Sequence, residues 1–456
     1  MGRKVRFADY EVDFTRHELR KGGVRVGLQH KPFRVLELLL RNPGDLITRQ
    51  ELVRYLWPDS HVSFEHGLNS AVNSLRQALG ESSRESRFIE TRPGLGYRFC
   101  APVQEITEPK GNSGLSTAGE KSPDAFEDCL KGRYFLEKME EEEVHKAIAY
   151  FNSALASDAC SAPAHAGLAE AYCQLAVIGS VGPGQIAGRA RSCADAALAA
   201  DPDSPEAHVS DAHVRMVFEW DWAGSQNALA RAFGLDGDFV PAYAVRAALL
   251  RISGRSDEAL KVCREALALD PLSFPVNLQL AACFHAARDF KRSVDQCWKL
   301  LTLTPRFSPA QILLALAYEQ LGMYDESIVE FQNAQRCAGF QAAIISGLVH
   351  VLTAGGRKRE AEEALHELWK QSRNGYVSDY WQAVVCVGRR QFAQAASFLE
   401  DAASHRDTAL LWAKADPRFD PMRDDPRFQN VLHAMGIPIA EPLKALDAGR
   451  SLAFQS

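Results

Sequence analysis

Hydrophobic residues alternate with polar ones in short runs near the start of the chain and then change to helical spacing. From Phe7 to Val26 the alternating runs are separated by turn-forming residues, so this stretch predicts several short strands. Helical spacing begins at Pro32 and stops at residues 42–44, Asn-Pro-Gly, because proline lacks a donor and glycine lets the chain turn. The pattern therefore predicts a small unit that mixes strands and helices.

Two further helices and a hairpin complete this unit. Thr48 and Glu51 have the spacing of a capping box, which predicts a second helix over residues 49–57. A third helix is expected over residues 63–79, with a serine at its start and a glycine just after its end. Residues 87–99 contain two extended runs joined by a Pro-Gly-Leu-Gly turn, which is the pattern of a hairpin.

The third helix has two unlike faces. At about 100° per residue, one face collects four apolar side chains and predicts a buried stripe: Leu68, Val72, Leu75 and Leu79. The opposite face is polar and consists of His66, Ser70, Asn73 and Gln77, flanked by Asn69 and Arg76 on one side and by Ser74 on the other. No acidic residue lies between His66 and Gly80, and amides and hydroxyls without carboxylates suit hydrogen bonds to base edges beside phosphates. A plain exposed face of a small domain explains this helix equally well.

The order of these elements resembles the winged helix-turn-helix DNA-binding domain of the OmpR/PhoB type, over about residues 5–100. The matching runs are Asn42-Pro-Gly, Thr48-Arg-Gln-Glu-Leu, Leu56-Trp57, Leu75-Arg76, and Thr91 through Gly94-x-Gly96-Tyr97-Arg98-Phe99. In that family the recognition helix enters the major groove, the wing touches the neighbouring minor groove, and the tryptophan loop approaches the backbone. The resemblance implies base readout by Asn69, Ser70, Asn73 and Ser74, and phosphate or wing contacts by His66, Arg76, Trp57 and Arg92. Gln77, on the same helix face, is a further candidate for contact with DNA.

The sequence differs from this family in having fewer basic residues on the third helix and in the wing. The family often has arginine where the third helix has Asn73 and Ser74, and its wing usually has arginine where Pro93 stands. Fewer cations imply weaker anchoring to phosphates, so we expect binding as a homodimer or at tandem sites.

Residues 104–122 are poor in large apolar groups and rich in Gly, Ser, Thr and Glu, which predicts a flexible linker. Membrane-bound proteins of the CadC and ToxR sort, which such a head resembles, have a transmembrane helix about here. No apolar run of that length stands in this stretch, and none follows the basic amino terminus. We therefore expect a CadC/ToxR-like arrangement without the membrane span, in the cytoplasm.

The rest of the chain repeats with a period of 34 residues. One column of small residues keeps this period: Ser225, Ala259, Ser293, Ser327, Ala361 and Ala395. A second column, four residues later, is apolar: Leu229, Cys263, Cys297, Phe331, Leu365 and Leu399. A fixed small residue lets two helices approach closely while a fixed large one fills the gap, so the period predicts stacked helical hairpins.

These hairpins resemble the tetratricopeptide repeat. The best matches run from Asp257-Glu-Ala-Leu to Asp270-Pro271 and from Leu316-Ala-Tyr318 to Ala334. The resemblance implies an all-α superhelix of about eight hairpins over residues 123–406, with a concave surface for a protein, peptide or small ligand. Residues 407–456 are expected to form a polar capping segment and tail. Trp220 and Trp222, at a turn, are expected to pack on the next hairpin, the alternative being an aromatic anchor for a peptide.

The expected fold is thus mostly α: a small α+β winged-helix domain at residues 1–103, joined by a flexible linker to an all-α tetratricopeptide-repeat superhelix. The charges divide in the same way. Residues 1–103 carry 17 Lys and Arg against 12 Asp and Glu, whereas the remainder carries 35 against 46. A basic head on an acidic body indicates that only the head meets a polyanion such as double-stranded DNA.

The sequence contains no motif that indicates an enzyme. The sequence has no phosphate-binding loop, zinc-protease or serine-hydrolase motif, and Cys263 and Cys297 fall in the apolar column, so we expect no catalysis, cofactor or metal. The leading hypothesis is a bacterial-type transcription regulator that binds promoter DNA through its head and senses a partner through its repeats. The alternative is a repeat scaffold whose head binds protein. Changing Asn73 and Arg76 to alanine should abolish DNA binding under the first hypothesis and leave protein association intact under the second.

Overall fold

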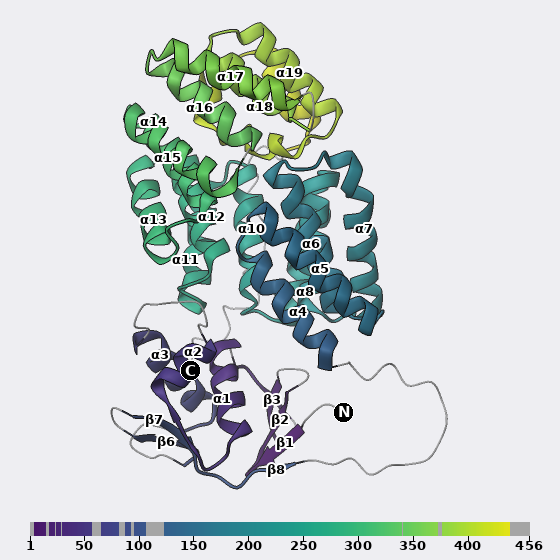
Figure 1. Cartoon of the computed structure of the whole chain (residues 1–456). Helices are drawn as coiled ribbons and strands as arrows, with labels where there is room; N and C mark the ends of the chain where they lie inside the picture. Colours follow the sequence, from purple (N-terminus) through teal and green to yellow (C-terminus); the bar gives the residue numbers. More distant parts are fainter. Residues whose placement is uncertain are drawn as a thin grey trace, which may run out of the picture. The chain divides into compact units, whose positions relative to one another are not determined.

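The computed structural model describes residues 4–14, 18–22, 24–28, 30–56, 65–81, 87–92, 95–105, 123–339, 341–372 and 376–437. The chain divides into two compact units, Met1–Lys121 and Ser122–Ser456 (Figure 1). We call them the head and the array and describe each by itself. None of the helices in the described ranges is long and apolar enough to cross a membrane.

The head begins with an antiparallel sheet. Its first four strands are β1 (Lys4–Phe7), β2 (Tyr10–Asp13), β3 (Glu18–Lys21) and β4 (Val24–Val26), as the alternating pattern predicts. A fifth strand, β8 (Gln104–Glu105), pairs with the other edge of β1, so the sheet has the order β4-β3-β2-β1-β8. The expected start of the linker at residue 104 is therefore wrong, because residues 104 and 105 are hydrogen-bonded into the head.

Three helices and a second sheet complete the head. The helices are α1 (His30–Arg41), α2 (Arg49–Leu56) and α3 (Glu65–Ala78), and the second sheet has the order β5 (Leu46–Thr48), β7 (Gly96–Phe99), β6 (Ile89–Arg92). The capping box is confirmed: the Thr48 amide donates to Glu51 Oε2 at 2.8 Å, and the Glu51 amide donates to Thr48 Oγ1 at 3.2 Å. Ser63, the expected cap of α3, lies outside the described residues, whereas Gly80 follows the helix with φ of 66°.

The apolar stripe of α3 is buried as expected. Leu68, Val72, Leu75 and Leu79 pack in one core with α1 and with aromatic side chains of the two sheets. Phe7 of β1 and Phe99 of β7 meet edge to face with ring centroids 4.9 Å apart, and the Tyr10 hydroxyl donates to the Leu79 carbonyl at 2.9 Å. The core thus fixes α3 against both sheets and leaves its polar side outward.

The array consists of helices that pair as antiparallel hairpins (Figure 1). The described residues of the array form eight such pairs: α4 (Pro123–Leu136) with α5 (Glu141–Ser157), α6 (Ala162–Ile178) with α7 (Pro183–Ala200), α8 (Pro205–Val214) with α9 (Trp222–Leu235), α10 (Val240–Ile252) with α11 (Ser256–Leu269), α12 (Phe274–Ala286) with α13 (Phe290–Leu303), α14 (Ser308–Gln320) with α15 (Tyr324–Ala338), α16 (Ala342–Ala354) with α17 (Lys358–Ser372), and α18 (Asp379–Gly388) with α19 (Phe392–Ser404). A short π-helical turn, η1 (Arg215–Glu219), extends α8.

The two 34-residue columns are buried throughout the array. Serine at a small-column position also bonds to the partner helix: Ser225, Ser293 and Ser327 donate to the carbonyls of Ala212, Ala281 and Ala315 at 2.8, 3.0 and 2.7 Å. The first helices of neighbouring hairpins contact one another, α6 with α8, α8 with α10 and α10 with α12. The first helices therefore line the inner surface of the superhelix.

Residues 407–437, which we call the C-terminal segment, do not form the expected polar cap. The segment contains η2 (Thr408–Trp412), η3 (Pro417–Met422) and α20 (Pro426–Ala434), and its Phe419 and Phe428 side chains are fully buried. It packs in one core with hairpins from both ends of the array. Trp222 is buried in the same core, and its Nε1 donates to the Met435 carbonyl of this segment at 2.8 Å.

Candidate nucleic-acid interface

The outward side of α3 presents uncharged polar groups. Asn73 and Gln77 are exposed and Ser74 is half-buried. Within the described part of the head, neither Asn73 nor Gln77 has a hydrogen-bond partner for its side chain. Both amides are thus available to bond with a base edge, each with a donor and an acceptor. The side chains of His66 and Ser70, and the whole of Trp57, lie outside the described residues.

Asn69 lies where α3 meets the first turn of α2 and the wing. Its Oδ1 accepts hydrogen bonds from an Arg49 guanidinium nitrogen at 2.8 Å and from the Tyr97 hydroxyl at 3.1 Å. Arg49 also donates to the Tyr97 hydroxyl at 2.9 Å. This three-residue network joins α2, α3 and β7, so the carbonyl of Asn69 is used within the head and only its amide nitrogen remains to donate to a base.

Arg76 does not point outward, which corrects its assignment as a phosphate or wing contact with DNA. Its side chain is buried, with the whole residue 5% exposed, and its guanidinium donates to the Ile89 carbonyl at 2.8 Å and to Thr91 Oγ1 at 2.6 Å. Nε lies 3.7 Å from the carboxylate of Glu81. Strand β6 covers this flank of α3, so Arg76 joins α3 to β6 from the inside.

Glu81 completes this junction. Its carboxylate accepts hydrogen bonds from the backbone amides of Phe88 at 2.6 Å and Ile89 at 3.1 Å. Burial raises the pKa of Glu81, while these amides and the Arg76 guanidinium act in the opposite direction. Arg76 and Glu81 together therefore fix the start of β6 relative to the end of α3.

The wing carries an exposed cation beside a carboxylate. Arg92, at the end of β6, is exposed, and its Nε lies 2.9 Å from Glu90 Oε1. Arg98 on β7 also approaches Glu90, at 3.6 Å. Leu95 at the turn is 59% exposed, and its carbonyl accepts from the Arg49 amide at 3.0 Å. The turn of the wing is thus tied to the start of α2 and presents Arg92 to solvent.

Sequence reasoning missed Arg49, which organises the exposed end of α3 through Asn69 and Tyr97. The available signal was its position, directly after the capping threonine, where a long side chain at the start of α2 can reach across to α3. Its partners are 20 and 48 residues away in the sequence, and no local pattern identifies such contacts.

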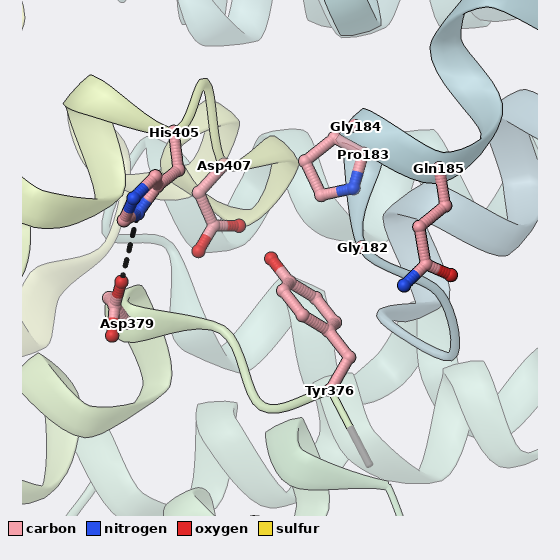
Figure 2. Close-up of a pocket in the computed structure, with 8 residues that line it drawn as sticks. All are labelled: Gly182, Pro183, Gly184, Gln185, Tyr376, Asp379, His405 and Asp407. Atoms are coloured by element: carbon pink, nitrogen blue, oxygen red, sulfur yellow. Dashed lines mark ion pairs between the residues drawn. The ribbon is translucent and has the colours of Figure 1, made fainter.

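The array has a separate small pocket between the start of α7 and the hairpin α18–α19 (Figure 2). Its volume is about 230 Å³, and Tyr376, Asp379, His405 and Asp407 contribute polar side chains to its wall. His405 Nδ1 lies 3.5 Å from the Asp379 carboxylate. Burial raises the pKa of both Asp379 and Asp407. Asp407 accepts hydrogen bonds from the Ser378 hydroxyl and, at 3.0 Å, from the Ala409 amide, so it holds the start of the C-terminal segment in place.

Comparison with known proteins agrees with the two units. Residues 23–99 match the family described as transcriptional regulatory protein, C terminal, and residues 308–336 match the tetratricopeptide repeat. Over 95 residues, 21% of this chain and 42% of the relative, the chain is 34% identical to the KDP operon transcriptional regulatory protein KdpE of Escherichia coli K12. Over 107 residues, 24% of this chain and 19% of the relative, it is 33% identical to the transcriptional regulator HilA of Salmonella typhimurium. The chain thus covers less than half of either relative.

Two solved structures are similar to parts of this chain. The response regulator DrrB, a Thermotoga maritima OmpR/PhoB homolog, is 29% identical with a TM-score of 0.20, over 21% of this chain and 44% of that one. The Cut9–Hcn1 hetero-tetramer structure is 13% identical with a TM-score of 0.47, over 67% of this chain and 55% of that one. From the family matches and the geometry above, the chain combines an N-terminal winged-helix domain of the OmpR/PhoB type with a tetratricopeptide-repeat array.

Proposed function

We propose that this protein is a bacterial-type transcription regulator and not an enzyme: the head binds promoter DNA, and the array receives a partner that modulates the head. The observation that carries the proposal is the outward side of α3. Asn73 and Gln77 stand there with their amides available, on a helix held from behind by its apolar stripe and by Arg76. A rigid helix that presents amides without carboxylates suits hydrogen bonding in the major groove.

The roles of the head residues follow from their placement. Asn73, Gln77 and Ser74 read bases, and Asn69 adds a single donor while its carbonyl orients it against Arg49. Arg92 contacts a phosphate next to the wing, and for that it exchanges its ion pair with Glu90. Because few cations in the described part of the head face outward beside α3, one head anchors weakly to phosphates, and the protein binds DNA as a homodimer or at tandem half-sites.

The experiment compares promoter fragments with random duplex by fluorescence anisotropy, using the full chain and the variant Asn73→Ala with Gln77→Ala. Loss of amide contacts to bases costs about 1–3 kcal/mol for each bidentate pair, which is roughly 5- to 150-fold in affinity for the preferred fragment for each of the two amides removed. Affinity for random duplex should change little, because that affinity comes from phosphates. Gln104→Ala, an exposed amide on β8, is the matched control and should leave both affinities unchanged.

Equal binding of all fragments by the unchanged protein at every salt concentration would refute sequence-specific DNA binding. The role of the array is tested by comparing the full chain with the fragment Met1–Lys121, which has its own core. A difference in affinity for the preferred fragment supports modulation of the head by the array, and identical affinities contradict it.

A further inference from the structure

One arginine of the array is buried without an opposite charge to balance it. Arg251, near the end of α10, is 4% exposed, and its Nε and Nη1 atoms have no hydrogen-bond partner among the described residues. The face of the Trp412 ring lies over its guanidinium, with 4.1 Å to the ring centre. An isolated cation is costly to bury, and buried charges in proteins are normally paired with an opposite charge. A negative charge next to Arg251 would remove this cost.

The groups that can supply such a charge are thiols. Among the described residues, the ionisable groups that act on the charge of Arg251 are Cys283, Cys263 and Tyr380, and they oppose the lowering of its pKa by burial. The Tyr380 hydroxyl donates to Asp416 Oδ2 at 2.7 Å, and burial raises its pKa, so this phenol stays neutral. The two cysteines are left as the source of an anion.

Cys263 of α11 and Cys283 of α12 form a hydrogen-bonded pair. Both are fully buried in one apolar cluster with side chains of α10. The Cys263 thiol donates to the Cys283 sulfur. This hydrogen bond, and Arg251 to a smaller degree, lower the pKa of Cys283 against the effect of burial, while the pKa of Cys263 is raised. The thiolate is therefore favoured on Cys283, and Cys263 keeps its proton.

Packing alone does not account for this pair. Leu249 and Ala317 stand one 34-residue period before and after Cys283, so other hairpins fill the same place with an apolar side chain. Cys297 stands one period after Cys263 and is equally buried, but burial raises its pKa and its hydrogen-bond neighbour is Ser293. Cys297 is thus a matched control for a thiol in the same column that has a hydroxyl as its neighbour.

We propose that Cys263 and Cys283 are a redox modification site of the array, which a small hydroperoxide such as hydrogen peroxide converts to a reversible disulfide. Arg251 stabilises the thiolate that reacts. Hydrogen peroxide is uncharged and close to water in size, so local opening of the array is sufficient for it to reach a buried pair. The site lies in the array and does not depend on DNA binding, so its test leaves DNA out.

The reaction balances with hydrogen peroxide as the oxidant. The Cys283 thiolate attacks one oxygen, the O–O bond breaks, and the other oxygen leaves as hydroxide, which takes up a proton to become water. Cys283 is then a sulfenic acid. The Cys263 sulfur attacks the Cys283 sulfur, the S–O bond breaks, and the hydroxyl leaves as water with the proton of Cys263. The two thiols lose two electrons and two protons, and one peroxide becomes two waters.

The disulfide would connect two neighbouring hairpins. Cys263 lies on the second helix of the fourth hairpin, and Cys283 lies on the first helix of the fifth. A bond between α11 and α12 restricts the unfolded chain and holds the two hairpins at one fixed contact. A dithiol reductant restores both thiols by exchange, so the connection is reversible.

The test exposes the full chain to hydrogen peroxide, blocks the remaining thiols by alkylation in denaturant, and identifies disulfides by mass spectrometry of peptides. Far-UV circular dichroism is recorded on the same samples before denaturation. The expected product is a Cys263–Cys283 disulfide with an unchanged helical signal, reduced again by dithiothreitol, while Cys297 stays a thiol. The proposal is overturned if the exposed Cys100 is oxidised while the pair stays reduced, or if the disulfide forms only as the helical signal is lost.

Variants of Arg251 test the source of the reactivity. Arg251→Met should still fold, because it removes a buried charge that has no partner. It should slow disulfide formation by about 3-fold or more, because a rise of about one unit in the pKa of Cys283 cuts the thiolate fraction tenfold and makes the remaining thiolate more nucleophilic. Arg251→Lys keeps a cation and should react faster than Arg251→Met, and the control Cys297→Ala should react at the rate of the unchanged protein. Equal rates for Arg251→Met and the unchanged protein would overturn the proposal.

Discussion

Arg76→Ala is expected to weaken the head rather than to remove a contact with DNA. The buried guanidinium donates to the Ile89 carbonyl and to Thr91 Oγ1, and it balances the charge of Glu81, whose side chain is only 2% exposed. Removal of one partner from a buried ion pair costs about 3–5 kcal/mol, because the other charge stays buried without compensation. A small domain is stable by about 5–15 kcal/mol in total, so the loss is a large share.

The assay is urea unfolding of the fragment Met1–Lys121, followed by circular dichroism, together with DNA affinity corrected for the folded fraction. Arg76→Ala should lower the free energy of unfolding by about 3–5 kcal/mol, and the folded fraction should bind DNA almost normally. The double variant Arg76→Met with Glu81→Gln buries neither charge and keeps a carbonyl acceptor for one of the Phe88 and Ile89 amides. It should recover at least about half of the lost stability.

Gln77→Ala, exposed on the same helix, is the matched control and should change the free energy of unfolding by no more than about 0.5 kcal/mol. The reasoning is refuted if Arg76→Ala leaves the stability of the fragment unchanged while its DNA affinity falls. In that case Arg76 would reach the DNA, as its position on the helix flank suggested.

Three further predictions concern local contacts. Burial of His285 lowers its pKa to about 4. Between about pH 6.5 and 4, the unfolded chain therefore binds a proton that the folded array does not bind. The free energy of unfolding should fall by about 2 kcal/mol as the pH is lowered from 6.5 to 5. His285→Gln should lose this part of the pH dependence in urea unfolding of the full chain, and an unchanged profile would contradict the burial of a neutral imidazole. Gly347→Ala would place a Cβ against the Phe331 ring and should cost about 1–3 kcal/mol in thermal or urea unfolding, whereas Gly188→Ala on α7, with open space around it, should stabilise by about 0.5–1 kcal/mol. Thr48→Ala should destabilise the fragment Met1–Lys121 by about 1 kcal/mol through loss of the capping box, and Thr48→Ser should retain most of it; equal losses would show that the hydroxyl is not the cause.

The sequence allowed the parts of the fold with local periodicity to be predicted. The two columns of residues with a 34-residue period arise from contacts within one hairpin. Their spacing alone therefore predicts that Ser225 and Leu229 are buried between the two helices of a hairpin. The buried stripe of α3 and the capping box at Thr48 are local in the same sense. Such elements follow from side-chain direction along a helix, without knowledge of what packs on them.

The predictions that the structure contradicts concern places where segments distant in the sequence meet. A helical pattern shows that Arg76 stands on a flank of α3, but not that β6 covers that flank. The C-terminal segment has no helical period around Phe419, and its partners on α6 are more than 200 residues away, so its burial left no pattern in the sequence. The pairing of β8 with β1 is likewise a contact between two ends of the head.

The candidate site was predictable in outline. The outward placement of Asn73 and Gln77 follows from the helical pattern and is confirmed by the structure, whereas their role in reading bases stays a prediction. Asn69 was assigned to base readout without Arg49 and Tyr97, because the network that holds its carbonyl comes from three separate elements.

The most direct test of DNA recognition by α3 is the anisotropy measurement on promoter fragments, with the full chain and its Asn73→Ala, Gln77→Ala variant side by side. We expect the unchanged protein to select particular fragments and to bind less tightly as salt rises, and we expect the variant to lose the selection while it keeps its affinity for random duplex. Selection of the same fragments with equal affinity by both proteins would refute base readout by α3, because the readout would then come from another surface.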